Sequence, residues 1–258
     1  MKGMKTMTDI IISGANGHMG HMIYECIKDR SDCRVVAGID INTEQYADFP
    51  IAATPAELPV KGDVIIDFSH PALLDALLEY SKTTGTPVVY ATTGYSEEQI
   101  AKIKSAAETS PVFFSWNMSM GINLLVELSK KAAAFLGDQF DIEILEKHHN
   151  RKLDAPSGTA LMLANGINEV FDGEKEYVYD RHSVRKKREK KEIGISAIRG
   201  GTIVGEHDII FAGNDEVITL SHSAASRRVF AVGSINAAIF IKDKPAGMYD
   251  MSDVFKEL

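Results

Sequence analysis

DIIISGANGHMG, residues 9–20, is the segment from which the architecture of this chain can be worked out. An apolar run with the length of a buried strand leads directly into glycines at positions 14, 17 and 20, where a helical pattern begins. This order matches a GxxGxxG variant of the turn that binds dinucleotides. Gly14 permits the tight turn, Gly17 lets backbone approach a pyrophosphate, and Gly20 allows close packing of helix on strand. The amides at the helix start are expected to hold the phosphates. A glycine-rich turn without a ligand is the alternative.

Strands and helices alternate outward from this segment through the first half of the chain. Further apolar runs of strand length occur at 33–39, 63–68, 87–91 and 111–115, and helical patterns separate them at 71–82 and 96–108. This alternation predicts an α/β fold with a Rossmann-type doubly wound parallel sheet.

The rhythm changes after about residue 120. Helical patterns at 122–135 and 157–170 enclose a strand at 141–145, and strand patterns then follow at 192–198, 208–212 and 216–221. A Gly-Asn-Asp turn at 213–215 predicts a hairpin. We therefore expect a second, α+β domain with an open mixed sheet. The last helical pattern, at 226–240, could belong to either domain on periodicity alone.

The composition narrows the class of protein. With 258 residues, 45% of them hydrophobic, the chain can bury a sizeable core, which excludes a disordered or fibrous protein. The net charge of −8 argues against general nucleic-acid binding; residues 181–191 carry +6, leaving −14 elsewhere, and we interpret this basic run as a solvated, mobile segment. Neither a membrane span nor a signal region is present, so we expect a cytoplasmic protein with no nucleic-acid or membrane partner.

An acidic residue follows the second predicted strand, about 20 residues beyond the last glycine. Asp40 would accept hydrogen bonds from the adenosine ribose hydroxyls and would repel a 2′-phosphate. The next residues, Ile41, Asn42 and Thr43, supply no cation for such a phosphate, although His18 would contribute when protonated. We therefore predict that NADH is the preferred cofactor and that NADPH is possible.

Small and hydroxylated residues follow the third and fourth predicted strands. In open α/β folds the carboxyl ends of the strands form the ligand-binding edge. We expect Phe68, Ser69, Thr92, Thr93 and Gly94 to contact the ribose and carboxamide of the cofactor. Ordinary strand-to-helix turn chemistry is the alternative for each loop.

EKHHNRKLDAPSGTA, residues 146–160, is the second informative stretch. His148, His149, Arg151 and Lys152 gather basic groups at the end of a strand in an acidic chain, so they would attract a small anion. A solvated surface loop is the alternative. A metal site is not expected, because adjacent histidines point apart and no suitably spaced Cys or further His completes a set.

A helix is predicted to begin immediately after these basic residues. Ser157 is a good N-cap, and the backbone amides of Gly158 and Thr159, with the Thr159 hydroxyl, would form a carboxylate receptor. The missing side chain at Gly158 would let the ligand come close. Two anion-binding elements side by side predict a small dicarboxylate ligand.

Six motifs together resemble the 4-hydroxy-tetrahydrodipicolinate reductase family, also called dihydrodipicolinate reductases. The similarity covers nearly the whole chain and rests on GANGHMG at 14–20, DFS at 67–69, TTG at 92–94, EKHHNRK at 146–152, DAPSGTA at 154–160 and VGEH at 204–207. It implies reduction of 4-hydroxy-tetrahydrodipicolinate (dihydrodipicolinate) to tetrahydrodipicolinate by hydride transfer from NAD(P)H, in lysine and diaminopimelate biosynthesis. It further implies a homotetramer in which residues 1–119 and 227–258 form the dinucleotide-binding domain and residues 120–226 the substrate-binding and oligomerisation domain.

The resemblance also implies roles for individual residues. His148 and Lys152 match the catalytic pair, and His149, Gly158 and Thr159 match the substrate carboxylate site. The segment at Ser115, Asn117 and Met118 matches the lining of the nicotinamide pocket. The full set of cofactor-binding residues implied by the turn, the loops and this segment is Gly14, Asn16, Gly17, His18, Met19, Asp40, Phe68, Ser69, Thr92, Thr93, Gly94, Ser115, Asn117 and Met118. Many relatives carry arginine in place of His18, and some have a basic residue in place of Ile41.

Our hypothesis for the chemistry assigns the proton to Lys152, because an ammonium beside an anionic substrate both attracts it and can protonate the product of hydride transfer. His148 would orient or share this proton. Another two-domain Rossmann dehydrogenase, of homoserine or sugar type, would explain the glycine turn and Asp40 but not residues 148–159. A non-catalytic NADH-sensing regulator would explain only the first half, and a scaffold neither motif.

Overall fold

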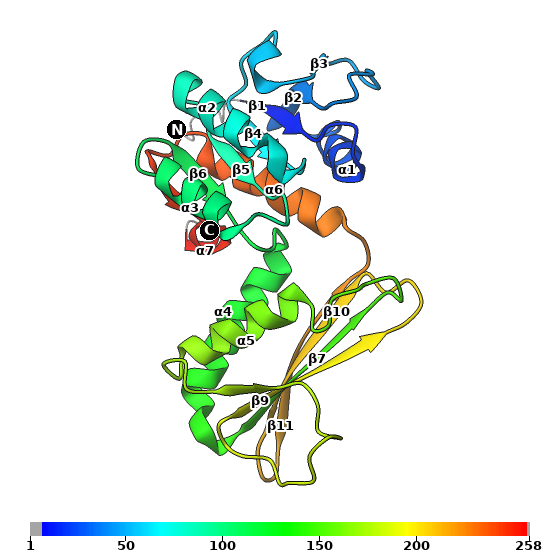
Figure 1. The fold of residues 1–258 in the computed structure, drawn as a ribbon, viewed down its shortest axis with the longest axis vertical. Helices are drawn as coiled ribbons and strands as arrows, with labels where there is room; N and C mark the ends of the chain where they lie inside the picture. Colours follow the sequence, from blue (N-terminus) through cyan, green and yellow to red (C-terminus); the bar gives the residue numbers. More distant parts are fainter. Residues whose placement is uncertain (1–6, 257–258) are drawn as a thin grey trace. The chain divides into compact units, whose positions relative to one another are not determined.

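A computed structural model describes residues 7–256, and the chain divides into two compact units (Figure 1). The first unit contains the residues up to Met118 together with those from Arg228 onward, and the second contains Ser119–Arg227. The second unit is therefore inserted, in sequence, between two parts of the first.

The first unit is built on a seven-stranded sheet. Its order is β12 (Gly247–Tyr249), β6 (Pro111–Phe114), β5 (Val88–Tyr90), β4 (Val64–Asp67), β1 (Thr8–Ser13), β2 (Cys33–Ile39) and β3 (Ile51–Ala52). Every neighbouring pair is parallel. Strands β2 and β3 extend the sheet to one side of β1, and β4, β5 and β6 extend it to the other side, so the order of the strands reverses between β1 and β4. The expected doubly wound parallel sheet is confirmed, and the reversal is the place where such folds bind ligands.

Helices connect or follow the strands of this sheet. They are α1 (His18–Ile27), α2 (Leu74–Thr84), α3 (Glu97–Ala106), α6 (Arg228–Ile241) and α7 (Met251–Lys256), with 3-10 turns at Pro55–Glu57 and Pro71–Leu73. The capping box predicted by the sequence begins α3, where Ser96 and Gln99 exchange side-chain and backbone hydrogen bonds. Helix α6 contacts α1 and the strands β4, β5 and β6, so the last long helix packs in the first unit.

The second unit contains a five-stranded mixed sheet. Its order is β11 (Val217–Ala224), β10 (Gly205–Ala212), β7 (Asp141–His148), β9 (Glu192–Arg199) and β8 (Glu176–Val178). The hairpin of β10 and β11 is antiparallel, as is the pair β10 and β7, whereas β9 is parallel to both β7 and β8. The expected open mixed sheet is therefore confirmed.

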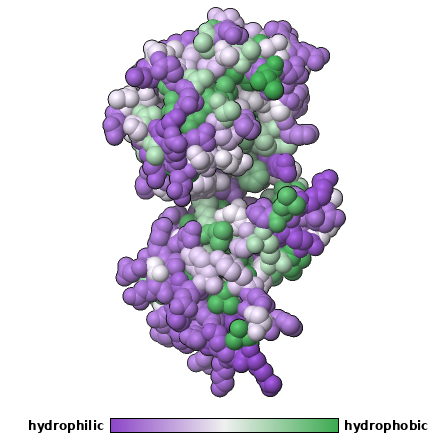
Figure 2. Space-filling model, in the orientation of Figure 1, coloured by the Kyte–Doolittle hydropathy of each residue, from purple (hydrophilic) through white to green (hydrophobic). Residues whose placement is uncertain are grey.

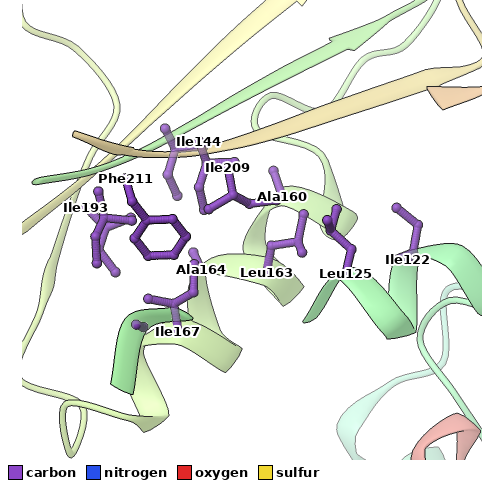
Figure 3. Close-up of a cluster of buried hydrophobic side chains, with 13 residues drawn as sticks. Ile122, Leu125, Ile144, Ala160, Leu163, Ala164, Ile167, Ile193, Ile209 and Phe211 are labelled. Carbon is purple, nitrogen blue, oxygen red and sulfur yellow. The ribbon is translucent and has the colours of Figure 1, made fainter. Parts of the chain in front are cut away.

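Helices α4 (Met120–Leu136) and α5 (Gly158–Glu169) pack on one face of this mixed sheet, and a 3-10 turn at Gly137–Gln139 follows α4. Figure 3 shows the core between them, in which sheet residues such as Ile144, Ile209 and Phe211 point toward Leu163 and Ile167 of α5. Every second residue of β7 is buried, so the strand presents one continuous buried face to the helices.

The same alternation carries polar residues inward at the end of β7. Ile142 and Ile144 lie in the apolar core, and Glu146 and His148 occupy the next two inward positions, both buried. Hydrophobic burial thus fixes the register of the strand, and the register brings two ionisable side chains to the edge of the core beside the start of α5.

The basic run at 181–191 is held on the sheet rather than being wholly solvated. Arg181 pairs with Glu192 at 2.7 Å and with Glu143 at 2.6 Å, and Arg188 pairs with Asp141 at 2.9 Å and with Glu143 at 3.1 Å. Arg181 lowers the pKa of Glu192 to about 2, against the opposing effect of burial. Most of the run, Arg181 included, is exposed, as expected of a solvated segment. The interpretation is wrong for Arg188, which is largely buried and binds carboxylates on β7.

Figure 2 shows a face of the molecule that is mainly hydrophilic, with hydrophobic residues in small scattered groups. Within residues 7–256, the helices are all too short or too polar to traverse a lipid bilayer.

Candidate active site

The glycine turn between β1 and α1 is shaped by backbone contacts. Gly14 has φ +80°, and a Cβ there would lie 2.7 Å from the carbonyl oxygen of Phe68. A Cβ on Gly20 would lie 2.3 Å from the carbonyl oxygen of Gly14. Any side chain at these two positions would therefore force the turn apart, which is a structural reason for glycine independent of any ligand.

The amino terminus of α1 presents amides in this turn. Gly17 is its N-cap, and among residues 7–256 no side chain forms the capping hydrogen bond. The first turn also contains no acidic residue. The residues present thus fit an anionic pyrophosphate, because the dipole and the uncapped amides both favour negative charge at this end.

Asp40 lies at the end of β2, next to the glycine turn. Its carboxylate accepts hydrogen bonds from the backbone amides of Asn16 at 2.9 Å and Asn42 at 3.0 Å. The Asn16 side chain donates to the carbonyl oxygens of Asn42 and Glu44, so it anchors the loop after β2. Ile41 projects outward with 97% of its surface exposed. Asp40 is therefore fixed in place, and its remaining lone pairs can accept from a ribose.

Asp67, at the end of β4, organises the loops at the carboxyl edge of the sheet. It is fully buried, and hydroxyl groups of four residues donate to it: Ser13 at 2.8 Å, Ser69 at 2.5 Å, Thr92 at 2.7 Å and Tyr95 at 3.0 Å. Burial, then the nearby Asp67 charge, raises the pKa of Tyr95, so its phenol keeps its proton and donates. Ser69 and Thr92 thus turn their hydroxyls inward to Asp67, while Phe68 is half-buried and Thr93 and Gly94 are exposed.

The segment after β6 forms a local turn. The Ser115 hydroxyl donates to the carbonyl oxygen of Asn117 at 2.9 Å. Met118 is buried, with 3% of its surface exposed, and a Cβ on Gly233 of α6 would lie 1.7 Å from the Met118 carbonyl oxygen. Trp116 is the exposed side chain of this segment, at 70%. The structure therefore packs Met118 against α6 of its own unit.

Glu146 is the centre of the second candidate site. The fully buried carboxylate of Glu146 receives both guanidinium nitrogens of Arg199 at 2.7 Å, the Nδ1 of His148 at 2.6 Å and the backbone amide of Ser157 at 3.0 Å. Burial works to raise the pKa of Glu146, but Arg199, His148 and the Ser157 amide together lower it below its ordinary value. The carboxylate is thus ionised and accepts all four bonds.

His148 is enclosed by this network and by a second histidine. The rings of His148 and His207 meet edge to face with centroids 5.2 Å apart, and His207 Nε2 lies 3.3 Å from the Ser157 hydroxyl. Burial, followed by the charge of His148, lowers the pKa of His207 to about 4. His207 is consequently neutral at neutral pH and places no charge against the His148 ring.

The loop between β7 and α5 carries the remaining basic residues. Lys152 donates its backbone amide to the His149 carbonyl at 3.1 Å and its ammonium pairs with Asp154 at 2.8 Å. Burial of the ring, then the Arg151 charge, lowers the pKa of His149. Arg199 donates to the Asp154 carbonyl oxygen at 2.7 Å, which ties this loop to the Glu146 network.

Helix α5 begins as the sequence predicts. Ser157 is its N-cap and accepts a hydrogen bond from the Ala160 amide at 3.1 Å. Outside its own helix and chain neighbours, a Cβ on Gly158 would meet no heavy atom of residues 7–256 within 4 Å. The packing of the chain therefore does not require glycine here, in contrast with Gly14, and the open space is available to a ligand.

The predicted residues fall into two groups, one on each unit. The glycine turn, Asp40 and the loops after β4 and β5 share the carboxyl edge of the parallel sheet. His148 and the start of α5 are joined through Glu146, and Lys152 lies on the loop that connects them.

Sequence reasoning gave no role to Asp67, Glu146, Arg199 and His207. The period-two pattern around β7 and β10 could have indicated that Glu146 and His207 point inward.

Comparison with known proteins gives consistent results over both units. Residues 8–118 match the family described as dihydrodipicolinate reductase, N-terminus, and residues 121–255 match its C-terminus. The 4-hydroxy-tetrahydrodipicolinate reductase of Caldanaerobacter subterraneus subsp. tengcongensis is 49% identical over 251 residues, which are 97% of this chain and 99% of the relative.

Solved structures show a similar fold. A dipicolinate-bound dihydrodipicolinate reductase from Paenisporosarcina sp. TG-14 has a TM-score of 0.79 at 25% identity, covering 95% of this chain and 98% of that one. A myo-inositol dehydrogenase from Corynebacterium glutamicum has a TM-score of 0.56 at 15% identity, covering 96% of this chain and 92% of the other. The second likeness concerns the fold alone.

Proposed function

The chain belongs to the dihydrodipicolinate reductase family and is a 4-hydroxy-tetrahydrodipicolinate reductase of lysine and diaminopimelate biosynthesis, and we propose that NADH is its preferred reductant and that His148 and Lys152 are its catalytic residues. The observation that carries the proposed site is the single network that joins His148, the Lys152 loop and the start of α5 through Glu146 and Arg199. A small dicarboxylate is the matching substrate, in line with the dipicolinate that the relative from Paenisporosarcina binds.

The first unit holds the reductant. The uncapped amides at the start of α1 would bind the pyrophosphate, and the carboxylate of Asp40 would accept hydrogen bonds from the ribose hydroxyls. The loops ordered by Asp67 and the segment at Ser115 and Asn117 would hold the nicotinamide end. NADH supplies a hydride when bound, and the chain supplies orientation, charge and a proton.

The reaction needs one hydride and one proton. Loss of the 4-hydroxyl group of 4-hydroxy-tetrahydrodipicolinate as one water gives the conjugated imine, dihydrodipicolinate. The hydride would bring two electrons to this imine, and the anion that results would take up a proton, which gives tetrahydrodipicolinate. Lys152 donates this proton and recovers it from solvent, because its ammonium lies on the loop that faces an anionic substrate. Asp154 holds this ammonium in the structure, and a substrate carboxylate would replace that partner.

The substrate carboxylates bind in the second unit. Gly158 and Thr159 offer backbone amides at the amino terminus of α5, and the open space at Gly158 lets a carboxylate oxygen approach them. His149, on the loop that leads to α5, would complete this receptor. The positive dipole of α5 and the basic loop both act on the same anion.

An assay with purified protein tests the proposal. Oxidation of NADH and of NADPH is followed with and without 4-hydroxy-tetrahydrodipicolinate, and we expect substrate-dependent oxidation with higher kcat/KM for NADH. Asp40→Ser combined with Ile41→Arg removes the ribose acid and adds a cation, so it is expected to reverse the preference; Asp48→Ser is the matched control. A preference of the unaltered chain for NADPH of about tenfold or more would contradict the role of Asp40. A different dehydrogenase or an NADH sensor would give no oxidation with this substrate.

We further propose that the second unit assembles the protein into a homotetramer and that the enzyme works in the cytoplasm. The two cysteines, Cys26 and Cys33, are both free, which suits a reducing compartment. Light scattering coupled to gel filtration measures the mass of the assembly, and a monomer at assay concentration would contradict the tetramer.

A further inference from the structure

We propose that Glu146 is a positioning residue that holds the His148 ring and the start of α5 in their working geometry, with Arg199 as its counter-ion. The proposal rests on the proposed function, in which His148 and α5 serve the reaction. It adds a residue pair that acts through His148, the Lys152 loop and the start of α5.

The first argument is the tautomer of His148. An ionised carboxylate can only accept hydrogen bonds, so the 2.6 Å contact with Glu146 requires the proton of the neutral ring to be on Nδ1. The lone pair is then on Nε2. A Cβ on Gly205 would lie 3.0 Å from this Nε2, so the glycine leaves room beside the reactive nitrogen. Glu146 thus selects the form of His148 that can accept and return a proton at Nε2.

The second argument is that the same carboxylate fixes the anion receptor. Glu146 Oε2 binds His148, and Oε1 binds the backbone amide of Ser157, the residue immediately before Gly158. A movement of the carboxylate would displace the ring and the helix start together. Orientation of the proton relay and binding of the substrate are therefore coupled through one side chain.

Arg199 stabilises the buried charge of Glu146. An unpaired buried carboxylate is strongly unfavourable, and the bidentate guanidinium neutralises it while leaving Oε2 and Oε1 able to accept one further bond each. Arg199 faces His148 across the parallel pair of β7 and β9, and it also binds the Asp154 carbonyl oxygen of the Lys152 loop. The ion pair therefore contacts His148, the start of α5 and the loop that carries Lys152.

A comparison within the same strand separates positioning from simple stabilisation. Glu143 is also paired with two arginines, Arg181 and Arg188, but it lies on the opposite face of β7, away from His148. Glu143→Gln is therefore a matched control for Glu146→Gln. Both remove one charge from a paired carboxylate, and only the second removes contacts with the proposed site.

The experiment is a double-mutant cycle of Glu146→Gln and His148→Gln, read as kcat and KM with 4-hydroxy-tetrahydrodipicolinate. Glu146→Gln alone is expected to lower kcat by about 10²-fold and to raise KM, because the tautomer and the helix start both lose their anchor. In the His148→Gln background the same change should have little further effect on kcat, while the effect on KM persists. Dipicolinate binding by calorimetry should weaken in parallel with KM, and NADH affinity should not change.

Several results would overturn the proposal. Normal kinetics of Glu146→Gln, or effects on kcat that multiply fully in the double variant, would show that Glu146 does not act through His148. Equal losses in Glu143→Gln would show a general effect on the sheet. If Glu146→Gln does not fold, Arg199→Lys takes its place in the cycle, since it keeps the counter-charge and loses the fork; additivity there refutes the proposal equally. Absence of substrate-dependent turnover in the unaltered enzyme would instead reject the proposed function.

Discussion

Two fully buried carboxylates, Asp67 in the first unit and Glu146 in the second, are stabilised in different ways. Asp67 accepts hydrogen bonds from neutral hydroxyl groups of Ser13, Ser69, Thr92 and Tyr95. Glu146 has a formal counter-ion, Arg199, in addition to its bonds with His148 and Ser157. Both lie at the end of a strand and both organise a candidate site.

The difference follows from what each site must attract. The Glu146 and Arg199 pair is neutral as a unit, so in the proposed site the positive charges of Arg151 and Lys152 would act on the substrate without opposition from a buried anion. The hydroxyl groups around Asp67 satisfy its oxygens by dipoles, and they also fix two loops at the carboxyl edge of the parallel sheet. One carboxylate thus balances charge, and the other orders the backbone.

The largest expected effect separates chemistry from cofactor binding. Lys152→Ala should lower kcat by on the order of 10²- to 10⁴-fold, because it removes the proposed proton donor. The NADH dissociation constant, measured by fluorescence titration, should stay the same. Lys147→Ala is the control, since Lys147 pairs with Glu206 and Asp208 on the outer face of β7. Turnover near normal in Lys152→Ala would refute the role of this lysine.

The opposite pattern is expected when the hydroxyl-bound carboxylate is changed. Asp67→Asn replaces acceptors by an amide that donates, which leaves buried hydroxyl groups poorly paired and should lower the free energy of unfolding by about 3 kcal/mol. NADH affinity should fall, whereas dipicolinate should bind as before. Urea denaturation and calorimetry measure these quantities. Asp75→Asn on the surface of α2 is the control, and its effect should stay within about 0.5 kcal/mol. Unchanged NADH affinity in folded Asp67→Asn would argue against an ordering role.

His207 makes the second unit sensitive to acid. Its pKa is about 4 in the folded protein and near 6.5 when unfolded, so between these values the unfolded state binds more protons and stability falls as pH falls. From pH 7 to pH 5 the chain should lose about 2 kcal/mol that His207→Gln does not lose. The lowered pKa values of His149 and His222 are common to both proteins and cancel. Identical pH dependence in the two would contradict this assignment, and His182→Gln serves as the exposed control.

The smallest expected effect concerns a single glycine. Gly158→Ala should leave thermal stability unchanged or slightly raised, because alanine favours helix and its Cβ meets no described atom outside its own helix. KM for the substrate and the dissociation constant of dipicolinate should rise about tenfold, by crowding of the carboxylate. Gly14→Ala gives the contrast, since its Cβ would collide with Phe68 and should lower stability. An unaltered KM in Gly158→Ala would remove the start of α5 from the substrate site.

The long elements could be predicted because their patterns are local. Periodicity identified the parallel strands, the capping box of α3 and the Ser157 N-cap of α5, each within one or two residues of its observed place. The short strands β3, β8 and β12 were missed, since two or three residues contain no periodic signal and form only by pairing with a neighbour. Pro71 begins a 3-10 turn before α2 rather than α2 itself.

In the candidate site, too, the residues within contiguous motifs could be predicted, whereas those that depend on contacts between distant elements could not. The glycine turn and residues 146–160 carry their chemistry in contiguous motifs, so their functional residues were visible in the sequence. Glu146 lay in the second motif without a role, because its partners Arg199 and Ser157 come from other elements. Arg188 was misread for the same reason, since its partner carboxylates are on β7. Pairing across strands depends on register, which sequence periodicity alone does not supply.

The two units are completed at different times during synthesis, because the last elements of the chain belong to the first unit. Edge strand β12 pairs with β6, and α6 packs on the central strands, yet both are encoded after residue 227. During synthesis the inserted unit, 119–227, is the first portion to have all of its residues, while the enclosing unit waits for the carboxyl end of the protein. A chain that stopped before residue 228 would therefore contain every residue of the second unit, attached to a first unit that lacks helices α6 and α7 and strand β12.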